Sequence, residues 1–101
     1  MKTKIFVNYK ENSEYIYFYL AESYEANDEI DKAISNYLKA ITVNEKFHPA
    51  YKKVAILYMA RNDYDDAIEY LQDYVKLDIT ELEKENTKSL INKIEKLKDE
   101  K

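Results

Sequence analysis

The sequence contains no cysteine, no glycine and no tryptophan, and it has one proline and one histidine. Without cysteine, neither a disulfide framework nor thiol chemistry is available. Without glycine, a glycine-rich loop that cradles a phosphate is excluded, and any turn with a positive φ must use another residue. With a single histidine and no cysteine, we expect no metal site.

Long hydrophobic runs are also missing. No stretch approaches the roughly 18 consecutive apolar residues that a membrane-spanning helix needs, so we expect no membrane span. The apolar stretch 5–7 is too short for the hydrophobic region of a signal peptide. The sequence therefore predicts a cytoplasmic protein.

Positive charge is scarce in the middle of the chain. The 101 residues carry a net charge of −4, and residues 14–79 hold thirteen acidic side chains against seven basic ones. Residues 1–13 are instead basic, and residues 80–101 are balanced. Because phosphate groups are bound by clustered lysine and arginine, the acidic body argues against nucleic acid or an anionic membrane as the main partner.

A pattern with a period of 34 residues is the main positive feature of the sequence. Between residues 14–47 and 48–81, seven positions are identical. The repeated positions are mostly small or aromatic: Tyr17, Leu20, Ala21, Tyr24, Ala33, Ile34 and Tyr37 return as Tyr51, Val54, Ala55, Tyr58, Ala67, Ile68 and Leu71. Small and aromatic residues at helical spacing are what a closely packed helix pair requires.

This pattern resembles the tetratricopeptide repeat (TPR) in its period and in its small and aromatic positions. The resemblance implies an all-α fold, a right-handed superhelical array of antiparallel helix pairs with two TPR units and a C-terminal capping helix. In one domain, 1–101, we expect a first repeat at 14–47 and a second repeat at 48–81. Residues 82–101 are then the capping helix, and residues 1–13 form an arm or the remnant of a half-repeat.

The apolar spacing predicts helices over residues 14–26, 29–43, 49–61 and 64–77. Asp28 and Asn62 lie in the turns between paired helices, where TPR proteins commonly have glycine. Asparagine and aspartate are the next-best residues for the left-handed region, so both turns remain feasible. Pro49 is compatible with the first turn of the third helix.

The C-terminal segment reads as a helix that is apolar on one side. Thr80 and Glu83 have the spacing of a capping box, with Thr87 as a second possible start. The apolar side is a stripe made of Leu90, Ile91, Ile94 and Leu97. Such a helix can close a stack of repeats against water.

Most of the eleven tyrosines are expected in the core. Six occupy helix-packing positions of the repeat: Tyr17, Tyr24, Tyr37, Tyr51, Tyr58 and Tyr64. Tyr74 differs, because its counterpart in the first repeat is Ala40 and a ring there should push the next helix away.

The TPR resemblance implies a concave groove lined by the first helix of each pair. The partner-binding residues expected there are Tyr15, Phe18, Tyr19, Glu22, Glu25, Lys52, Lys53, Ile56 and Met59. Aromatic anchors with a charged rim suit an amphipathic helix or an extended peptide segment. Two interpretations remain open, since residues 1–10 could instead fold back and cover Tyr15, Phe18 and Tyr19.

One known TPR binding mode is not expected. Some TPR co-chaperones clamp a C-terminal carboxylate with lysine, asparagine and arginine side chains. The matching positions in the first two helix pairs are Phe18, Glu22 and Lys53, which do not reproduce the clamp. Glu22 would repel an acidic tail.

Catalytic groups are not assembled in the sequence. His48 is expected at an exposed helix start, and the acids at 63–66 lack the loop of a calcium site and suit the first turn of a helix. We therefore expect no enzyme and no cofactor, but an adaptor, assembly factor or accessory subunit that binds a peptide or helix of a partner protein. The alternative is a structural module that forms a homodimer through its open N-terminal end or its groove.

Overall fold

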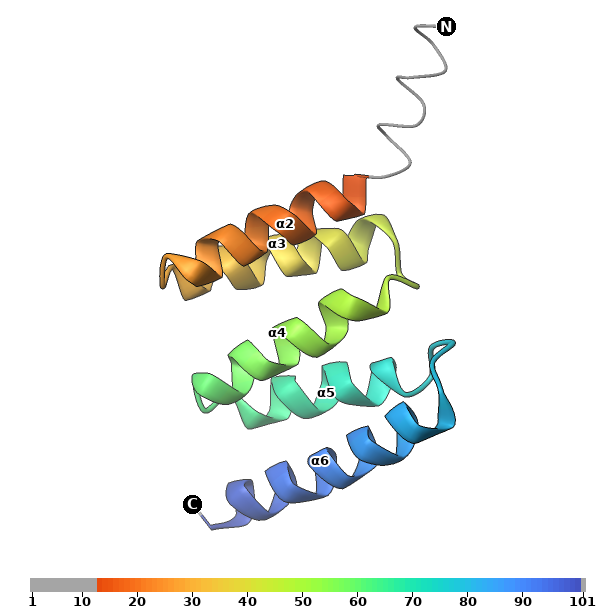
Figure 1. The fold of residues 1–101 in the computed structure, drawn as a ribbon. Helices are drawn as coiled ribbons and strands as arrows, with labels where there is room; N and C mark the ends of the chain where they lie inside the picture. Colours follow the sequence, from red (N-terminus) through yellow and green to blue (C-terminus); the bar gives the residue numbers. More distant parts are fainter. Residues whose placement is uncertain (1–12, 101) are drawn as a thin grey trace, which may run out of the picture. The chain divides into compact units, whose positions relative to one another are not determined.

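The computed structural model describes residues 13–100, which form five α-helices and no strand (Figure 1). In chain order they are α2 (Ser13–Ala26), α3 (Ile30–Val43), α4 (His48–Ala60), α5 (Tyr64–Tyr74) and α6 (Glu81–Asp99). The all-α helical-repeat prediction is confirmed. The chain divides into two compact units, with the boundary between Ala50 and Tyr51.

In the first unit, α2 packs along α3. Both helices carry buried small residues, and Ala21, Ala33 and Ala40 are fully buried. The side chain of Tyr37 is also fully buried beside them. Because an alanine side chain is a single methyl group, the two helices can approach closely, and the aromatic ring fills the space that remains.

In the second unit, residues from α4, α5 and α6 share one core. The buried members of this core cluster are Ala55, Ala67, Ile68, Leu71, Ile91 and Ile94. The predicted apolar stripe of α6 is therefore partly right. Ile91 and Ile94 are buried and Leu90 packs against the cluster, whereas Leu97 is exposed.

Both predicted turns adopt the left-handed conformation. Asp28 has φ 63° and Asn62 has φ 65°. In each turn the next residue closes the helix end in the same way, since the amides of Glu29 and Asp63 donate to the carbonyls of Tyr24 and Tyr58, both at 2.9 Å. The 34-residue period thus extends to the backbone hydrogen bonds of the turns.

Two predictions about α5 are wrong. The helix ends at Tyr74 and not at residue 77, because the amides of Lys76 and Leu77 bond to carbonyls three residues back, which closes the chain into a tighter turn. Tyr74 does not push the next helix away. Its side chain is buried, and its hydroxyl donates a hydrogen bond to Glu83 of α6.

The predicted core tyrosines divide into two groups. Tyr37 and Tyr51 are buried as expected. The other four, Tyr17, Tyr24, Tyr58 and Tyr64, are half-buried. Lysine ammonium groups lie over the rings of Tyr17 and Tyr24. The predicted arm or half-repeat remnant at residues 1–13 lies outside the described residues, apart from Ser13.

The left-handed turn at Asp28 gives a direct test of the backbone geometry. Asp28→Ala should lower the free energy of unfolding by about 1 kcal/mol, because a Cβ without a local polar partner is disfavoured at positive φ. Asp28→Gly should raise it by a few tenths of a kcal/mol or leave it unchanged. Urea titration measures both values, with Asn92→Ala on the exposed side of α6 as the control. Equal stability of the Ala and Gly variants would contradict the assigned turn.

Candidate partner-binding surface

Five aromatic rings of the first unit form what we call the aromatic cluster: Tyr15, Phe18, Tyr19, Tyr37 and Phe47. Phe18 is its centre, packing edge-on against Phe47 and Tyr37 with ring centroids 5.3 and 5.5 Å apart. Tyr15 also meets Phe47 edge-on at 4.9 Å. Edge-to-face pairs of this kind are favoured by the ring quadrupoles, so the cluster holds its rings in defined positions.

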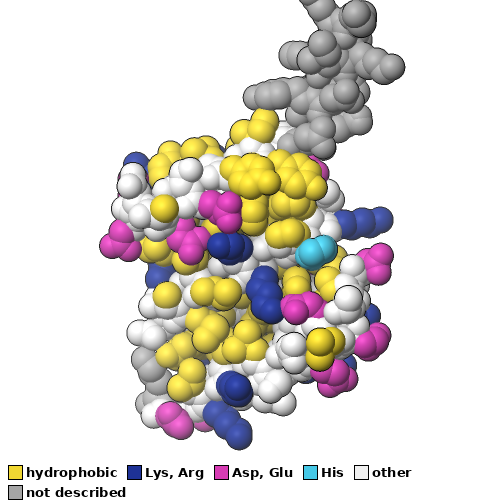
Figure 2. Space-filling model, viewed as in Figure 1, with side chains coloured by type: hydrophobic (Ala, Val, Ile, Leu, Met, Phe, Trp, Pro, Cys, Tyr) yellow, Lys and Arg dark blue, Asp and Glu magenta, His cyan; other side chains and the backbone are white. Residues whose placement is uncertain are grey.

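The aromatic cluster runs from a buried base to an exposed rim. Tyr37 and Phe47 are buried and Phe18 is half-buried, whereas Tyr15 is 44% exposed and Tyr19 is 60% exposed. The exposed pair lies one helical turn apart with stacked rings, 6.4 Å between centroids. Figure 2 shows hydrophobic side chains gathered on this part of the molecule, with acidic side chains beside them.

Phe47 is a member that the sequence did not single out as part of the surface. It lies two residues before Pro49, directly before the start of α4. Its carbonyl accepts a bond from the amide of Ala50, and its own amide donates to Asn44. An aromatic residue two positions before the proline was the available signal.

Glu25 fixes the polar side of the aromatic cluster. The hydroxyl of Tyr37 donates to Glu25 Oε1 at 2.7 Å. Burial, followed by this hydrogen bond and the negative charges of Glu25 and Glu22, raises the pKa of Tyr37 well above its ordinary value. Glu22 and Glu25 are both half-buried, as a charged rim beside an apolar surface requires.

Glu14 anchors the turn that carries Phe47. It is a buried acid in the first turn of α2, and its Oε2 accepts a hydrogen bond from Asn44 Nδ2 at 3.2 Å. Its other oxygen, Oε1, has no hydrogen-bond partner within the described part of the chain. The positive end of α2 favours a carboxylate at this position, which offsets part of the cost of burial.

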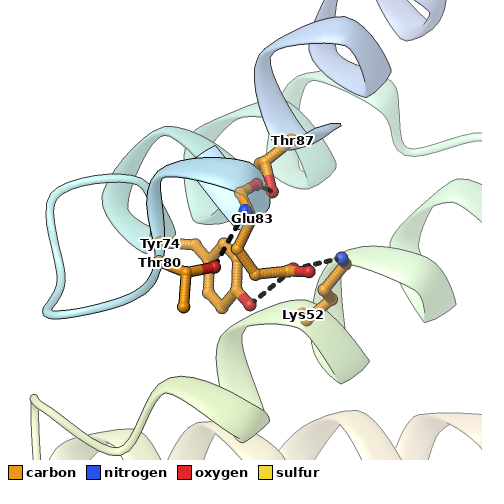
Figure 3. A network of polar contacts seen from close by, with 5 residues as sticks. All are labelled: Lys52, Tyr74, Thr80, Glu83 and Thr87. Carbon is orange, nitrogen blue, oxygen red and sulfur yellow. Dashed lines mark hydrogen bonds and ion pairs between the residues drawn. The ribbon is translucent and has the colours of Figure 1, made fainter. Parts of the chain in front are cut away.

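The predicted groove residue Lys52 makes an internal contact in the second unit. Its ammonium group lies 2.7 Å from Glu83 Oε1 of α6, and 5.6 Å from the centre of the Tyr74 ring (Figure 3). The Tyr74 hydroxyl donates to the same carboxylate oxygen at 2.9 Å. Lys52 therefore helps to hold α6 against α4 and α5.

Glu83 also connects two turns of α6 through its backbone. Its amide donates to Thr80 Oγ1 at 3.1 Å, which confirms Thr80 as the helix cap, and its carbonyl accepts from the buried Thr87 hydroxyl at 2.8 Å (Figure 3). Burial, followed by the hydrogen bond to Glu83 and the charge of Glu83, raises the pKa of Tyr74 to about 12. Glu83 therefore takes part in the start of α6 through its backbone and in the docking of α6 through its carboxylate.

The other predicted residues of α4 have different surroundings. Ile56 is exposed, Lys53 is half-buried, and Met59 packs against the core cluster of the second unit. His48 is exposed at the start of α4, as predicted.

Over residues 13–100, no three histidine, cysteine, aspartate or glutamate side chains are grouped so that they could hold a metal ion. In the same range, every helix is too short or too polar to span a membrane. The acids Asp65 and Asp66 lie in the first turn of α5, where they face its positive end.

The role of Glu83 can be tested by truncation. Glu83→Ala should lower the free energy of unfolding by about 1–2 kcal/mol, because the buried Tyr74 hydroxyl loses its acceptor while the half-exposed ion pair contributes little. Glu81→Ala is the matched control, since Glu81 lies on the same helix turn with a side chain 87% exposed. Urea titration compares the two variants, and equal losses would show that the Glu83 contacts are not stabilising.

The raised tyrosine pKa values predict a loss of stability in alkali. Tyrosine in the unfolded chain ionises near pH 10, whereas folded Tyr74 keeps its proton to about pH 12. The contribution of Tyr74 is therefore complete below pH 10 and is lost as the pH rises through 12, falling by roughly 1 kcal/mol at pH 11. Urea titrations between pH 8 and pH 11 should show a shallower decline for Tyr74→Phe than for the wild type. Parallel curves would contradict the assigned hydrogen bond.

Comparison with known proteins identifies a family and a solved structure that share this helical-repeat architecture. The tetratricopeptide repeat family model matches the chain twice, over residues 15–43 and 50–78. A search of curated proteins gave no match. The solution NMR structure of a tetratricopeptide repeat domain protein from Salinibacter ruber is similar in fold, with a TM-score of 0.76 and 17% sequence identity. The similarity covers 83% of this chain and 88% of the other.

The two family matches together span more than half of the chain, and each contains one of the helix pairs joined by a left-handed turn. The Salinibacter ruber structure adds agreement in fold. Tetratricopeptide repeats generally mediate protein–protein interaction, and they are generally not catalytic. On these grounds the chain belongs to the tetratricopeptide repeat family.

Proposed function

We propose that the chain is a non-catalytic interaction module that binds a segment of a partner protein at the exposed rim of the aromatic cluster. The observation that carries the proposal is the solvent-exposed pair Tyr15 and Tyr19. The ring of Tyr15 packs on the buried Phe47, and the ring of Tyr19 packs on the half-buried Phe18. Large aromatic side chains on a fixed support are the typical energetic anchors of protein interfaces. Since a tyrosine loses little conformational entropy on binding, such a rim is pre-organised for a ligand.

Charge indicates the chemistry of the partner segment. Residues 13–50 carry seven acidic side chains and three lysines, and Glu22 and Glu25 adjoin the aromatic cluster. We therefore expect a segment that places an apolar residue on the tyrosines and a lysine or arginine near the two glutamates. Adaptor, assembly factor and accessory subunit are roles that share this binding step.

The predicted site residues differ in how well their contacts suit a binding role. Lys53 and Ile56 on α4 stay predictions for a contact in the second unit, since Lys53 is half-buried and Ile56 is exposed. Lys52 and Met59 have internal contacts that account for them without a partner. Phe18 is a support for the rim, so its replacement would disturb the cluster as well as the surface.

The binding surface is tested with peptides selected by phage display on the full chain. The Kd of a selected peptide, measured by fluorescence anisotropy, should rise at least about tenfold for the double variant Tyr15→Ala, Tyr19→Ala. Leu82→Ala is the control, because Leu82 is an exposed apolar residue on α6.

Circular dichroism checks that the double variant remains helical. An unchanged Kd in a folded double variant would contradict the proposed surface, as would an equal loss in Leu82→Ala. Peptides enriched in acidic residues would contradict the proposed charge preference.

A further inference from the structure

The solvent side of α2 differs from the same positions in the second repeat. Ile16 and Leu20, one turn apart on α2, are 40% and 41% exposed. Thirty-four residues later, Ala50 and Val54 are both 0% exposed. Within residues 13–100, the second repeat therefore buries positions that the first repeat leaves partly exposed.

A third pair of equivalent positions is also exposed in the first repeat and buried in the second. Ser23 is exposed on α2, whereas its counterpart Leu57 is buried. Helical spacing places six residues on one side of α2, which we call the outer face: Tyr15, Ile16, Tyr19, Leu20, Ser23 and Ala26. None of these six side chains is charged, although more than a third of the residues in the chain are. A wide uncharged strip on an exposed helix is typical of a surface that another element covers.

We propose that the outer face binds the same face of a second copy of the chain, with the two α2 helices antiparallel. Large residues lie at its start and small residues at its end. In an antiparallel pair, Tyr15 of one copy meets Ala26 of the other, and Ile16 meets Ser23. Leu20 then lies near the two-fold axis. The face is therefore complementary to itself, as a symmetric dimer interface requires.

Charge does not oppose a second copy at this face. Two chains that each carry a net charge of −4 repel one another over most of their surfaces. The outer face lets them approach where neither presents a charged side chain. With 14 residues, α2 is about 21 Å long, so an interface of one helix from each copy is small. Its expected affinity is therefore micromolar.

The dimer is tested by sedimentation velocity on the full chain from roughly 1 to 200 μM, a range chosen to span that affinity. The wild type should pass from monomer to dimer across it. Leu20→Glu should raise the dimer Kd at least about 30-fold, because it buries a carboxylate at the two-fold axis. Leu97→Glu is the control, since Leu97 on α6 is 43% exposed, close to the 41% of Leu20.

Absence of cysteine allows a separate test of the antiparallel geometry. Mixed Ile16→Cys and Ser23→Cys chains should form disulfide-linked dimers faster than either variant alone under mild oxidation. A wild type that stays monomeric throughout the range overturns the proposal. Dimers retained in folded Leu20→Glu, or faster cross-linking of Ser23→Cys alone, also overturn it.

Discussion

Close packing of helices at alanine is the constraint on which the rest of this structure depends. Ala21 and Ala33 are fully buried in the first unit, and Ala55 and Ala67 take the same positions in the second. Because nothing larger than a methyl group separates the backbones, neighbouring large residues must fill the gaps at fixed places. The aromatic cluster is a consequence, since Tyr37 fills such a gap and Phe18 packs on it.

The fold was largely predictable because its determinants are local and repeated. Helical spacing of apolar residues placed every described helix to within three residues at each end. The turn residues Asp28 and Asn62 were predictable because few residue types tolerate a positive φ. The end of α5 and the place of Tyr74 were not predictable, because the tighter turn after Tyr74 and the hydrogen bond from Tyr74 to Glu83 depend on tertiary packing. A ring opposite a carboxylate can dock a helix or displace one, and the sequence alone does not distinguish these outcomes.

The candidate site was predictable in part, because helical spacing also determines which side chains of α2 are exposed. The exposed positions of Tyr15 and Tyr19 followed from the helical phase of α2, which the alanines define. The contribution of Phe47 and the contact of Lys52 with Glu83 did not follow. Lys52 and Glu83 are 31 residues apart, and several other acids were equally plausible partners in the sequence. Spacing predicts which face a side chain occupies, whereas the partner of a long side chain depends on tertiary packing.

The two repeats differ at many exposed positions, where a change of residue can alter binding without disturbing the packed core. The buried alanines Ala21 and Ala33 recur as Ala55 and Ala67, but Ile16 and Leu20 on α2 are more exposed than their counterparts in the second repeat. Tyr15 and Tyr19 lie at the border between the aromatic cluster and the outer face, so they belong to both proposed surfaces. A residue cannot be buried by two different molecules at once. Partner binding and self-association at α2 are therefore expected to compete. A partner that displaces the second copy must first break the dimer, so the free energy of dimerisation reduces the net free energy of partner binding.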